Sequence, residues 1–291
     1  MRHLGSPIWL LSPVFQRHVN RTATGNAEHD WLSYVRAIHL PPSLGSTLVI
    51  GCSTGALERA LVRKESVGRI TAVDADEAAV ERARRQAERA GMDSISYAVL
   101  DPVRDPLPPS AWDAIIASDV VHHIPNLEGF YLEVHRALAP RGCFVFHEYV
   151  GPNRFQYTDE RMDLIHRYFR LLPDRWRLDP STGRCLWRRE RIDAARLAQE
   201  DPAEAARSEE LLPLARAAFL AEAEYPHGGG LIHPVLSGLV GNFREGLSED
   251  ERLLQVLCDA EEDLMKRGLL PSDFVIFVGR RRDTERSLPM T

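Results

Sequence analysis

The chain has 291 residues, of which 44% are apolar and 27% charged, with a formal net charge of −6. This composition is typical of a soluble globular protein, and the mild acidic balance argues against nucleic acid or anionic membrane as a partner, because both require a basic face. The four cysteines form no C-x-x-C pair, which favours free thiols in a reducing cytoplasm. The N-terminal apolar run is too short for a signal peptide, and no apolar stretch approaches the roughly 20 residues of a membrane span. We therefore expect a cytoplasmic protein.

Residues 1–44 predict a helical N-terminal segment, because apolar residues between positions 31 and 38 recur at helical spacing. From residue 47 onward, short apolar runs alternate with segments of helix length. Strands are predicted at residues 47–50, 69–73, 95–100, 112–118 and 143–150, and helices at 54–64, 76–90 and 126–138. Strands connected through helices predict right-handed crossovers, and hence an α/β fold with a doubly wound, mostly parallel sheet.

This alternation ends after residue 150. Residues 157–217 are rich in Arg, Ala and Glu and predict helices, whereas residues 219–225 fit a helix by composition and a strand by alternation. A long amphipathic helix at 249–267 and a closing strand at 273–279 follow, and the residues after that strand are expected to fray. The patterns divide the chain into a helical N-terminal segment (1–44), a sheet core (45–150), a mainly helical insert (151–270) and a closing strand with its tail (271–291).

The turn after the first strand, Gly51-Cys52-Ser53-Thr54-Gly55, fits two kinds of site. It matches G-x-S-x-G, the nucleophile elbow of serine hydrolases, and HGGG at residues 227–230 matches an oxyanion-hole signature of esterases. In that fold, however, several strands precede the elbow and HGGG comes before it, whereas here the order is reversed. We therefore rank a serine hydrolase last and interpret HGGG as a turn or, alternatively, as part of an acceptor pocket.

The same turn is also typical of a loop that lets a nucleotide-like cofactor approach the backbone. Gly51 and Gly55 permit unusual backbone angles at the carboxyl edge of the sheet, where a helix begins. Asp74 ends the second strand, nineteen residues after Gly55, and can accept hydrogen bonds from both hydroxyls of a ribose. Asp101 ends the third strand and can accept from an adenine amino group, whereas Asp76 is expected to cap the next helix. Two glycines and two acids at one edge predict an adenosine site.

In these positions the chain resembles the class I S-adenosylmethionine-dependent methyltransferases. VIGCSTG, VDAD and VLDP are similar to the first three motifs of that family, and WDAIIASDVVHHIPN and LAPRGCFVFHEYV resemble its fourth and fifth strands. The resemblance covers about residues 45–150, and the remainder looks like a bacterial subset with a helical insert after the fifth strand. It implies a seven-stranded sheet, S-adenosylmethionine as the cofactor, S-adenosylhomocysteine as the product and no metal. The residues that it implies for cofactor binding are Gly51, Cys52, Ser53, Gly55, Asp74, Ala75, Asp101, Pro102, Ser118 and Asp119.

Two positions depart from the family pattern. The family has an acid where this chain has Val49, and a glycine where it has Ser53. We expect Asp119 or Ser118 to take over the role of the acid at the methionyl end of the cofactor. The departures also support an alternative function, a degenerate member that binds S-adenosylmethionine or its product and acts as an interaction or regulatory protein without catalysis.

Methyl transfer is an in-line displacement that depends on positioning, and a hydroxyl acceptor also needs a base. His123, after the fourth strand, is a candidate base, and the alternative is that it only packs against the cofactor or a helix. The neighbouring His122 is expected to face elsewhere. Glu148 and Tyr149, at the end of the fifth strand, are further candidates for catalysis at the acceptor, and a polar pair satisfied at a strand end is the alternative.

Asn153, Arg154 and Gln156 lie just beyond the fifth strand and are candidates for binding the acceptor, with an ordinary surface arginine as the alternative for Arg154. The sequence contains no motif for methylating a nucleic-acid base and no metal ligands at a recognisable spacing. We therefore expect methyl transfer to a small molecule, at an oxygen or a nitrogen of a sugar or a secondary metabolite. Nucleic acid, membrane and metal are not expected as partners, and a homodimer is left open.

Overall fold

The computed structural model describes residues 12–40, 44–64, 67–244 and 246–282. The run that we compared with a signal peptide falls largely on residues 1–11, and most of the expected tail on residues 283–291, so both lie outside the described residues. The described chain divides into two compact units. Unit 1 comprises residues 12–31, 149–209 and 225–275, and unit 2 comprises residues 32–148, 210–224 and 276–282. These boundaries differ from the four consecutive segments of the sequence-based division, because the chain passes between the units several times.

A seven-stranded sheet has the order β3-β2-β1-β4-β5-β7-β6. Its strands are β1 (Leu44–Ile50), β2 (Val67–Asp74), β3 (Ile95–Val99), β4 (Trp112–Ser118), β5 (Leu138–Tyr149), β6 (Leu220–Gly228) and β7 (Phe274–Arg280). Each neighbouring pair from β3 to β5 is parallel, and the strand order reverses at β1. The prediction of a doubly wound, mostly parallel sheet is confirmed, because parallel neighbours require the helical crossovers that the sequence places between these strands.

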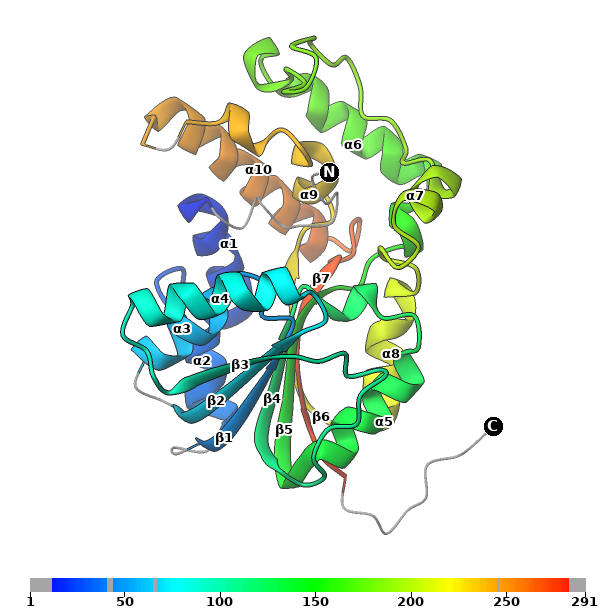
Figure 1. Ribbon diagram of the computed structural model, residues 1–291. Helices are drawn as coiled ribbons and strands as arrows, with labels where there is room; N and C mark the ends of the chain where they lie inside the picture. Colours follow the sequence, from blue (N-terminus) through cyan, green and yellow to red (C-terminus); the bar gives the residue numbers. More distant parts are fainter. Residues whose placement is uncertain (1–11, 41–43, 65–66, 245, 283–291) are drawn as a thin grey trace. The chain divides into compact units, whose positions relative to one another are not determined.

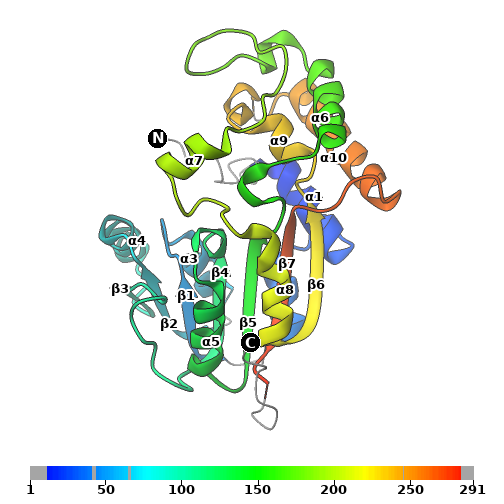
Figure 2. The same cartoon turned by 90° about the vertical axis from the view of Figure 1, so that its right-hand side faces the viewer.

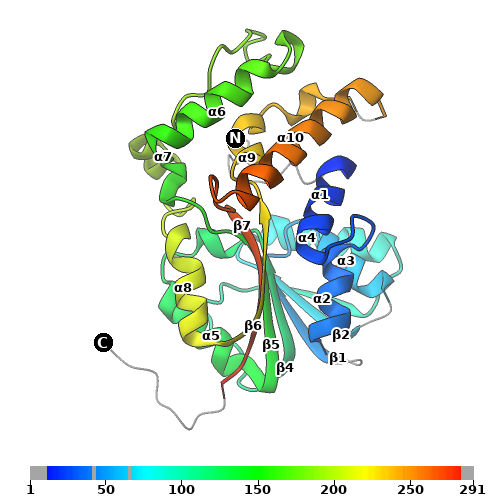
Figure 3. The same ribbon diagram turned by 180° about the vertical axis from the view of Figure 1, so that it is seen from behind.

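Helices cover both faces of the sheet in unit 2. Figure 1 shows α2 (Trp31–His39), α3 (Ala56–Arg63) and α4 (Glu77–Arg89) on one face, and Figure 2 shows α5 (Leu127–Ala137) and α8 (Ser208–Ala218) on the other. The view from behind also shows these two groups of helices on opposite faces of the sheet (Figure 3). Burial on both faces explains the continuous apolar runs of the central strands, in which Leu48, Val49 and Ile50 are at most 2% exposed. As expected, Asp76 caps α4: its carboxylate accepts a hydrogen bond from the Ala78 amide at 2.9 Å.

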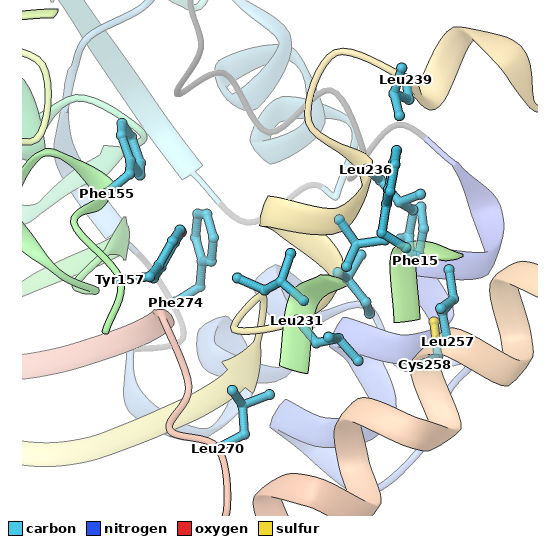
Figure 4. Close-up of a cluster of buried hydrophobic side chains, with 14 of the residues drawn as sticks. Phe15, Phe155, Tyr157, Leu231, Leu236, Leu239, Leu257, Cys258, Leu270 and Phe274 are labelled. Atoms are coloured by element: carbon cyan, nitrogen blue, oxygen red, sulfur yellow. The ribbon is translucent and has the colours of Figure 1, made fainter. Parts of the chain in front are cut away.

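Unit 1 is mainly helical, with α1 (Pro13–Thr24), α6 (Asp159–Leu171), α7 (Ala194–Glu200), α9 (Ile232–Leu236) and α10 (Ser248–Lys266). Within it, α1 and α9 pack on α10, and α6 packs on α9. The apolar faces of these helices share one core (Figure 4). In that view Phe155, Tyr157 and Phe274 gather at one end of the core, whereas Phe15 and Leu257 lie at the other.

Two local expectations differ from the structure. Residues 220–228 form β6, so alternation rather than composition identifies this segment. Residues 177–193, all of them described, form a loop where helix was expected. Turn chemistry explains the loop, because the carboxylate of Asp179 accepts from the Ser181 amide at 2.8 Å across Pro180. The predicted helix at 249–267 and strand at 273–279 are confirmed by α10 and β7. None of the described helices is both long and apolar enough to cross a bilayer.

Candidate functional site

The glycine loop leaves β1 at the carboxyl edge of the sheet and leads into α3. The amides of Gly51 and Cys52 both donate to the carbonyl of Val73 at the end of β2, at 2.8 and 3.1 Å. Gly51, Ser53 and Gly55 all have positive φ, at +79°, +48° and +73°. Ser53 therefore adopts a left-handed conformation that favours glycine, and this explains why the family pattern has glycine at its position.

Close approach within the protein accounts for both glycines of the loop. A Cβ atom on Gly51 would lie 2.7 Å from the Cβ of Val120, which follows β4. A Cβ atom on Gly55 would lie 2.7 Å from the Tyr97 hydroxyl and 2.9 Å from the Arg59 guanidinium. Packing within the protein therefore requires glycine at these two positions, in addition to the expected approach of a cofactor, because protein side chains already occupy the space beside them.

Asp74 joins the loop to the end of β2. Its Oδ2 accepts a hydrogen bond from the Ser53 amide, and its Oδ1 accepts from the Asp76 amide, each at 3.0 Å. A carboxylate offers about four lone-pair positions, so two amide donors orient the group and leave capacity for two hydroxyls. The side chain is partly exposed, and Ala75 beside it is exposed. The remaining acceptor capacity of Asp74 fits the two hydroxyls of a ribose.

Asp101 lies two residues beyond the end of β3 and organises its own turn. Its Oδ1 accepts from the Val103 amide at 2.9 Å, and its Oδ2 lies 3.5 Å from the Arg104 guanidinium. The side chain retains 31% of its exposure, and Pro102 follows it in a partly buried position. Asp74 and Asp101 therefore occupy the ends of neighbouring parallel strands, as the sequence predicts for the two ends of an adenosine.

Ser118, Asp119 and His147 form a polar group at the ends of β4 and β5. The Ser118 hydroxyl lies 3.1 Å from Asp119 Oδ2 and 3.3 Å from His147 Nδ1, and that nitrogen is 3.8 Å from Asp119 Oδ2. Asp119 has a positive φ of +54°. Burial raises the pKa of Asp119, and the His147 imidazole opposes this shift. Asp119 remains the candidate to replace the acid missing at Val49.

Glu148 is fully buried and hydrogen-bonded to the turn after β4. Its Oε1 accepts from the amides of Val120 and Val121, both at 2.7 Å, and its Oε2 lies 2.6 Å from His122 Nδ1. Burial works against its charge, but the His122 imidazole and the two amides lower the pKa of Glu148. Each carboxylate oxygen is therefore already engaged by this turn, which fits the satisfied polar group weighed as the alternative to acceptor binding.

His123 follows this anchored turn and is partly buried. Its ring centroid lies 4.3 Å from that of His122, with the two planes tilted by 38°. The expectation that His122 faces away from the acceptor stays a prediction, and its imidazole contacts both the buried Glu148 carboxylate and the His123 ring. The turn that carries the candidate base is thus held by a buried carboxylate.

The remaining candidates lie in unit 1, and each has an intramolecular role there. The Tyr149 hydroxyl donates to the Pro152 carbonyl at 3.0 Å, and Asn153 Oδ1 accepts from the Glu209 amide at 3.1 Å near the start of α8. The Arg154 guanidinium donates to three carbonyls, those of residues 201, 202 and 204. Gln156 Nε2 donates to the carbonyls of residues 154 and 192, both at 2.9 Å. Acceptor binding by these four residues stays a prediction.

The features that suggested a hydrolase have other roles. Ser53 is exposed, and its amide donates to Asp74. The HGGG segment ends β6 in unit 1, and the amide of Gly229, together with those of Leu231 and Ile232 directly after the segment, forms a nest that donates to the buried carboxylate of Glu261 at 2.7 to 3.0 Å. A nest filled by a carboxylate is a structural turn, as the first interpretation of HGGG expected.

Sequence reasoning missed Glu58, which lies in the first turn of α3 and is 0% exposed. Burial raises the pKa of Glu58 to about 7, against the lowering effects of its own backbone amide and of Arg59. A signal was present, because Leu61 follows three residues later on the same face and is buried. A carboxyl group on the buried face of the helix after the glycine loop is a candidate functional residue.

The fold and the residues at this edge define a class of protein. Residues 48–146 match the family described as "Methyltransferase domain". These residues, about a third of the chain, therefore form a methyltransferase domain, which confirms the resemblance to class I S-adenosylmethionine-dependent methyltransferases found in the sequence; the bacterial subset stays a prediction.

Individual relatives share this domain and only part of their length. The sterol 24-C-methyltransferase ERG6B of Gibberella zeae is 34% identical over 113 residues, which are 38% of this chain and 30% of that protein. The sterol 24-C-methyltransferase of Yarrowia lipolytica is 30% identical over 157 residues, which are 53% of this chain and 40% of that protein. The chain thus spans less than half the length of these curated relatives.

Solved structures show the same fold at low sequence identity. Phosphoethanolamine N-methyltransferase 2 of Haemonchus contortus has a TM-score of 0.53 at 12% identity, covering 87% of this chain and 52% of that chain. The [4+2]-cyclase SpnF has a TM-score of 0.51 at 18% identity, covering 94% of this chain and 93% of that chain. These likenesses concern the fold alone.

Proposed function

We propose that this chain binds S-adenosylmethionine at the carboxyl edge of β1 to β4 and transfers its methyl group to a small molecule. The observation that carries the proposal is the Asp74 carboxylate, which two backbone amides hold beside the glycine loop of a methyltransferase domain. In this arrangement Asp74 accepts hydrogen bonds from the ribose, and Asp101 accepts one from the adenine amino group. The N-terminus of α3 adds a favourable field for the carboxylate of the methionyl group.

The catalytic contribution of the protein is positioning and proton removal. When bound, the cofactor supplies an electrophilic methyl group on a sulfonium sulfur. His123 acts as the base that removes the proton of the acceptor, which is worth on the order of 10²–10⁴-fold in rate. Glu148 holds the turn that carries this histidine through two backbone amides and through His122. It is therefore a positioning residue in this proposal.

The acceptor that we propose is an oxygen or a nitrogen nucleophile of a small molecule such as a sugar or a secondary metabolite, in the cytoplasm. The curated relatives are named for methylation of a sterol carbon, so carbon is the competing acceptor atom. Residues of unit 1, among them Asn153, Arg154 and Gln156, remain the candidates for binding this molecule.

A second function is supported by two residues and by one solved structure. Val49 and Ser53 replace the acid and the glycine of the family pattern, and a protein of this fold is named a [4+2]-cyclase. The alternative function is a degenerate protein that binds S-adenosylmethionine or its product and acts as an interaction or regulatory protein without transferring a methyl group.

Two measurements on the full chain separate these possibilities. Calorimetric titration with S-adenosylmethionine and S-adenosylhomocysteine is expected to give micromolar binding of both, and no binding at high micromolar ligand would exclude the proposed enzyme. Transfer of a radioactive methyl group from the cofactor to a pool of small hydroxyl and amine compounds is expected to give labelled product and S-adenosylhomocysteine. Binding without any conversion would favour the alternative.

A further inference from the structure

Glu58 is an anomaly among the described residues, because its carboxyl group is buried without a partner. The residue is 0% exposed, and neither Oε1 nor Oε2 has a hydrogen-bond partner in the described part of the chain. Leaving a buried polar group unsatisfied is costly, and native structures keep such groups mainly where they serve a function. Glu148 and Glu261, buried to the same extent, are both fully engaged by amides and a histidine.

Glu58 lies in the first turn of α3, the helix that begins directly after the glycine loop, and its carboxyl group is buried there. It interacts electrostatically with Cys52 in the loop, with Asp74 at the end of β2 and with Tyr97 in β3. The neighbouring Arg59 is directed to the loop, because its guanidinium donates to the Thr54 carbonyl at 2.7 Å. In the described part of the chain, neither carboxylate oxygen of Glu58 has the Arg59 guanidinium as a hydrogen-bond partner.

The groups around Glu58 supply only part of the positive charge that a buried carboxylate requires. Burial raises the pKa of Cys52 to about 12 and also raises that of Tyr97, so both stay neutral near pH 7. Asp74 carries a negative charge and disfavours the ionised form of Glu58. The partial positive charge at the start of α3 and the guanidinium of Arg59 favour it. Glu58 is thus balanced between its two protonation states.

We propose that Glu58 is a charge partner for the sulfonium of S-adenosylmethionine and favours this cofactor over S-adenosylhomocysteine. The inference rests on the proposed function, in which the ribose on Asp74 carries the sulfur at its 5′ carbon. The sulfonium is a fixed positive charge, whereas the thioether of the product is neutral. A positive charge above the loop favours ionised Glu58, which loses its proton to solvent when the cofactor binds. After methyl transfer the charge is gone, Glu58 takes up a proton again, and product binding weakens relative to that of the substrate cofactor.

The test compares the affinities of S-adenosylmethionine and S-adenosylhomocysteine at pH 5.5 and pH 8. In the wild-type chain the preference for S-adenosylmethionine is expected to increase by about tenfold from the lower to the higher pH, which corresponds to about 1.4 kcal/mol. In the Glu58→Gln variant the preference is expected to change by less than twofold. Glu88→Gln, an exposed glutamate of α4, is the matched control and keeps the wild-type behaviour.

A second measurement needs no variant and decides the matter if Glu58→Gln does not fold. Calorimetry at pH 7 in two buffers of different ionisation enthalpy counts protons, and the wild-type chain is expected to release a fraction of a proton on binding S-adenosylmethionine and less on binding S-adenosylhomocysteine. Equal proton release for both ligands, or an unchanged pH dependence in Glu58→Gln, overturns the proposal. If neither ligand binds at all, the proposed function itself fails, and this outcome is distinct from binding without discrimination.

Discussion

The Glu58→Gln substitution should make the ligand-free protein less sensitive to alkaline pH. The pKa of Glu58 is raised from an ordinary value of 4.5 to about 7 in the folded chain. Between these values the folded state binds more protons than the unfolded state, so stability is present at low pH and falls as the pH rises towards 7. Each unit of pKa difference corresponds to about 1.4 kcal/mol, so the wild type loses about 2.5 kcal/mol between pH 5 and pH 8 through this residue.

Urea denaturation of both proteins at pH 5 and pH 8 measures this loss. The free energy of unfolding of Glu58→Gln minus that of the wild type is determined at each pH, and the two differences are compared. Any effect of the glutamine side chain that does not depend on pH cancels in this comparison. We expect Glu58→Gln to gain about 2 to 3 kcal/mol relative to the wild type on going from pH 5 to pH 8, and Glu88→Gln to gain nothing. A difference that does not change with pH would show that Glu58 is not a destabilised buried acid, and the reasoning on its burial would be refuted.

Three further substitutions test the packing around the site and in unit 1. Glu148→Ala leaves the buried Val121 amide, the partly buried Val120 amide and His122 without their acceptor, so urea denaturation should give a loss of about 3 to 5 kcal/mol, and a loss under 1 kcal/mol would contradict the assigned contacts. Because folding lowers the pKa of Glu148 below its ordinary value of 4.5, its contribution should be present above pH 4.5 and be lost as the pH falls through the lowered pKa of the folded state. Gly51→Ala forces a Cβ atom onto Val120 at a positive φ and should cost about 2 to 4 kcal/mol in the absence of any cofactor, whereas a neutral result would mean that only a ligand needs this glycine. Glu261→Ala should cost about 3 to 5 kcal/mol by emptying the amide nest, measured by thermal unfolding, and an unchanged midpoint would contradict the structural role of HGGG.

The sheet and its helices could be predicted because local patterns determine them. The apolar run that contains Val49 is long enough only for a strand covered on both faces. Asp76 is a typical N-cap residue and indicates where the next helix begins. Segment 219–225 was ambiguous, since its composition favours a helix while its place at the end of the sheet order selects a strand. Pairing with a distant strand selects the strand conformation here, and this pairing cannot be inferred from the propensities of the segment's own residues.

The placement of the candidate residues could be predicted where it depends on a strand end, and it could not be predicted where it depends on side-chain packing. Asp74 and Asp101 follow directly from the carboxyl ends of two parallel strands. The contact between Glu148 and the turn after β4 depends on the register that sets Ser118 beside His147, and this register cannot be read from either strand alone. Predicting Glu58 as a candidate would have required knowing which face of α3 is buried, and the nearby indication of that face was Leu61.

The most direct test of the central claim is the affinity of the Asp74→Ala variant for S-adenosylmethionine. The substitution removes the carboxylate that two backbone amides orient and that we propose accepts two hydrogen bonds from the ribose, and two hydrogen bonds to a charged group are worth at least about 1.5 kcal/mol each. Calorimetry is therefore expected to give a wild-type dissociation constant in the micromolar range and a value at least tenfold weaker for Asp74→Ala. The exposed Asp93→Ala control should bind like the wild type. Equal affinities of the wild type and Asp74→Ala would contradict the account, because the cofactor would then be held somewhere other than at this edge of the sheet.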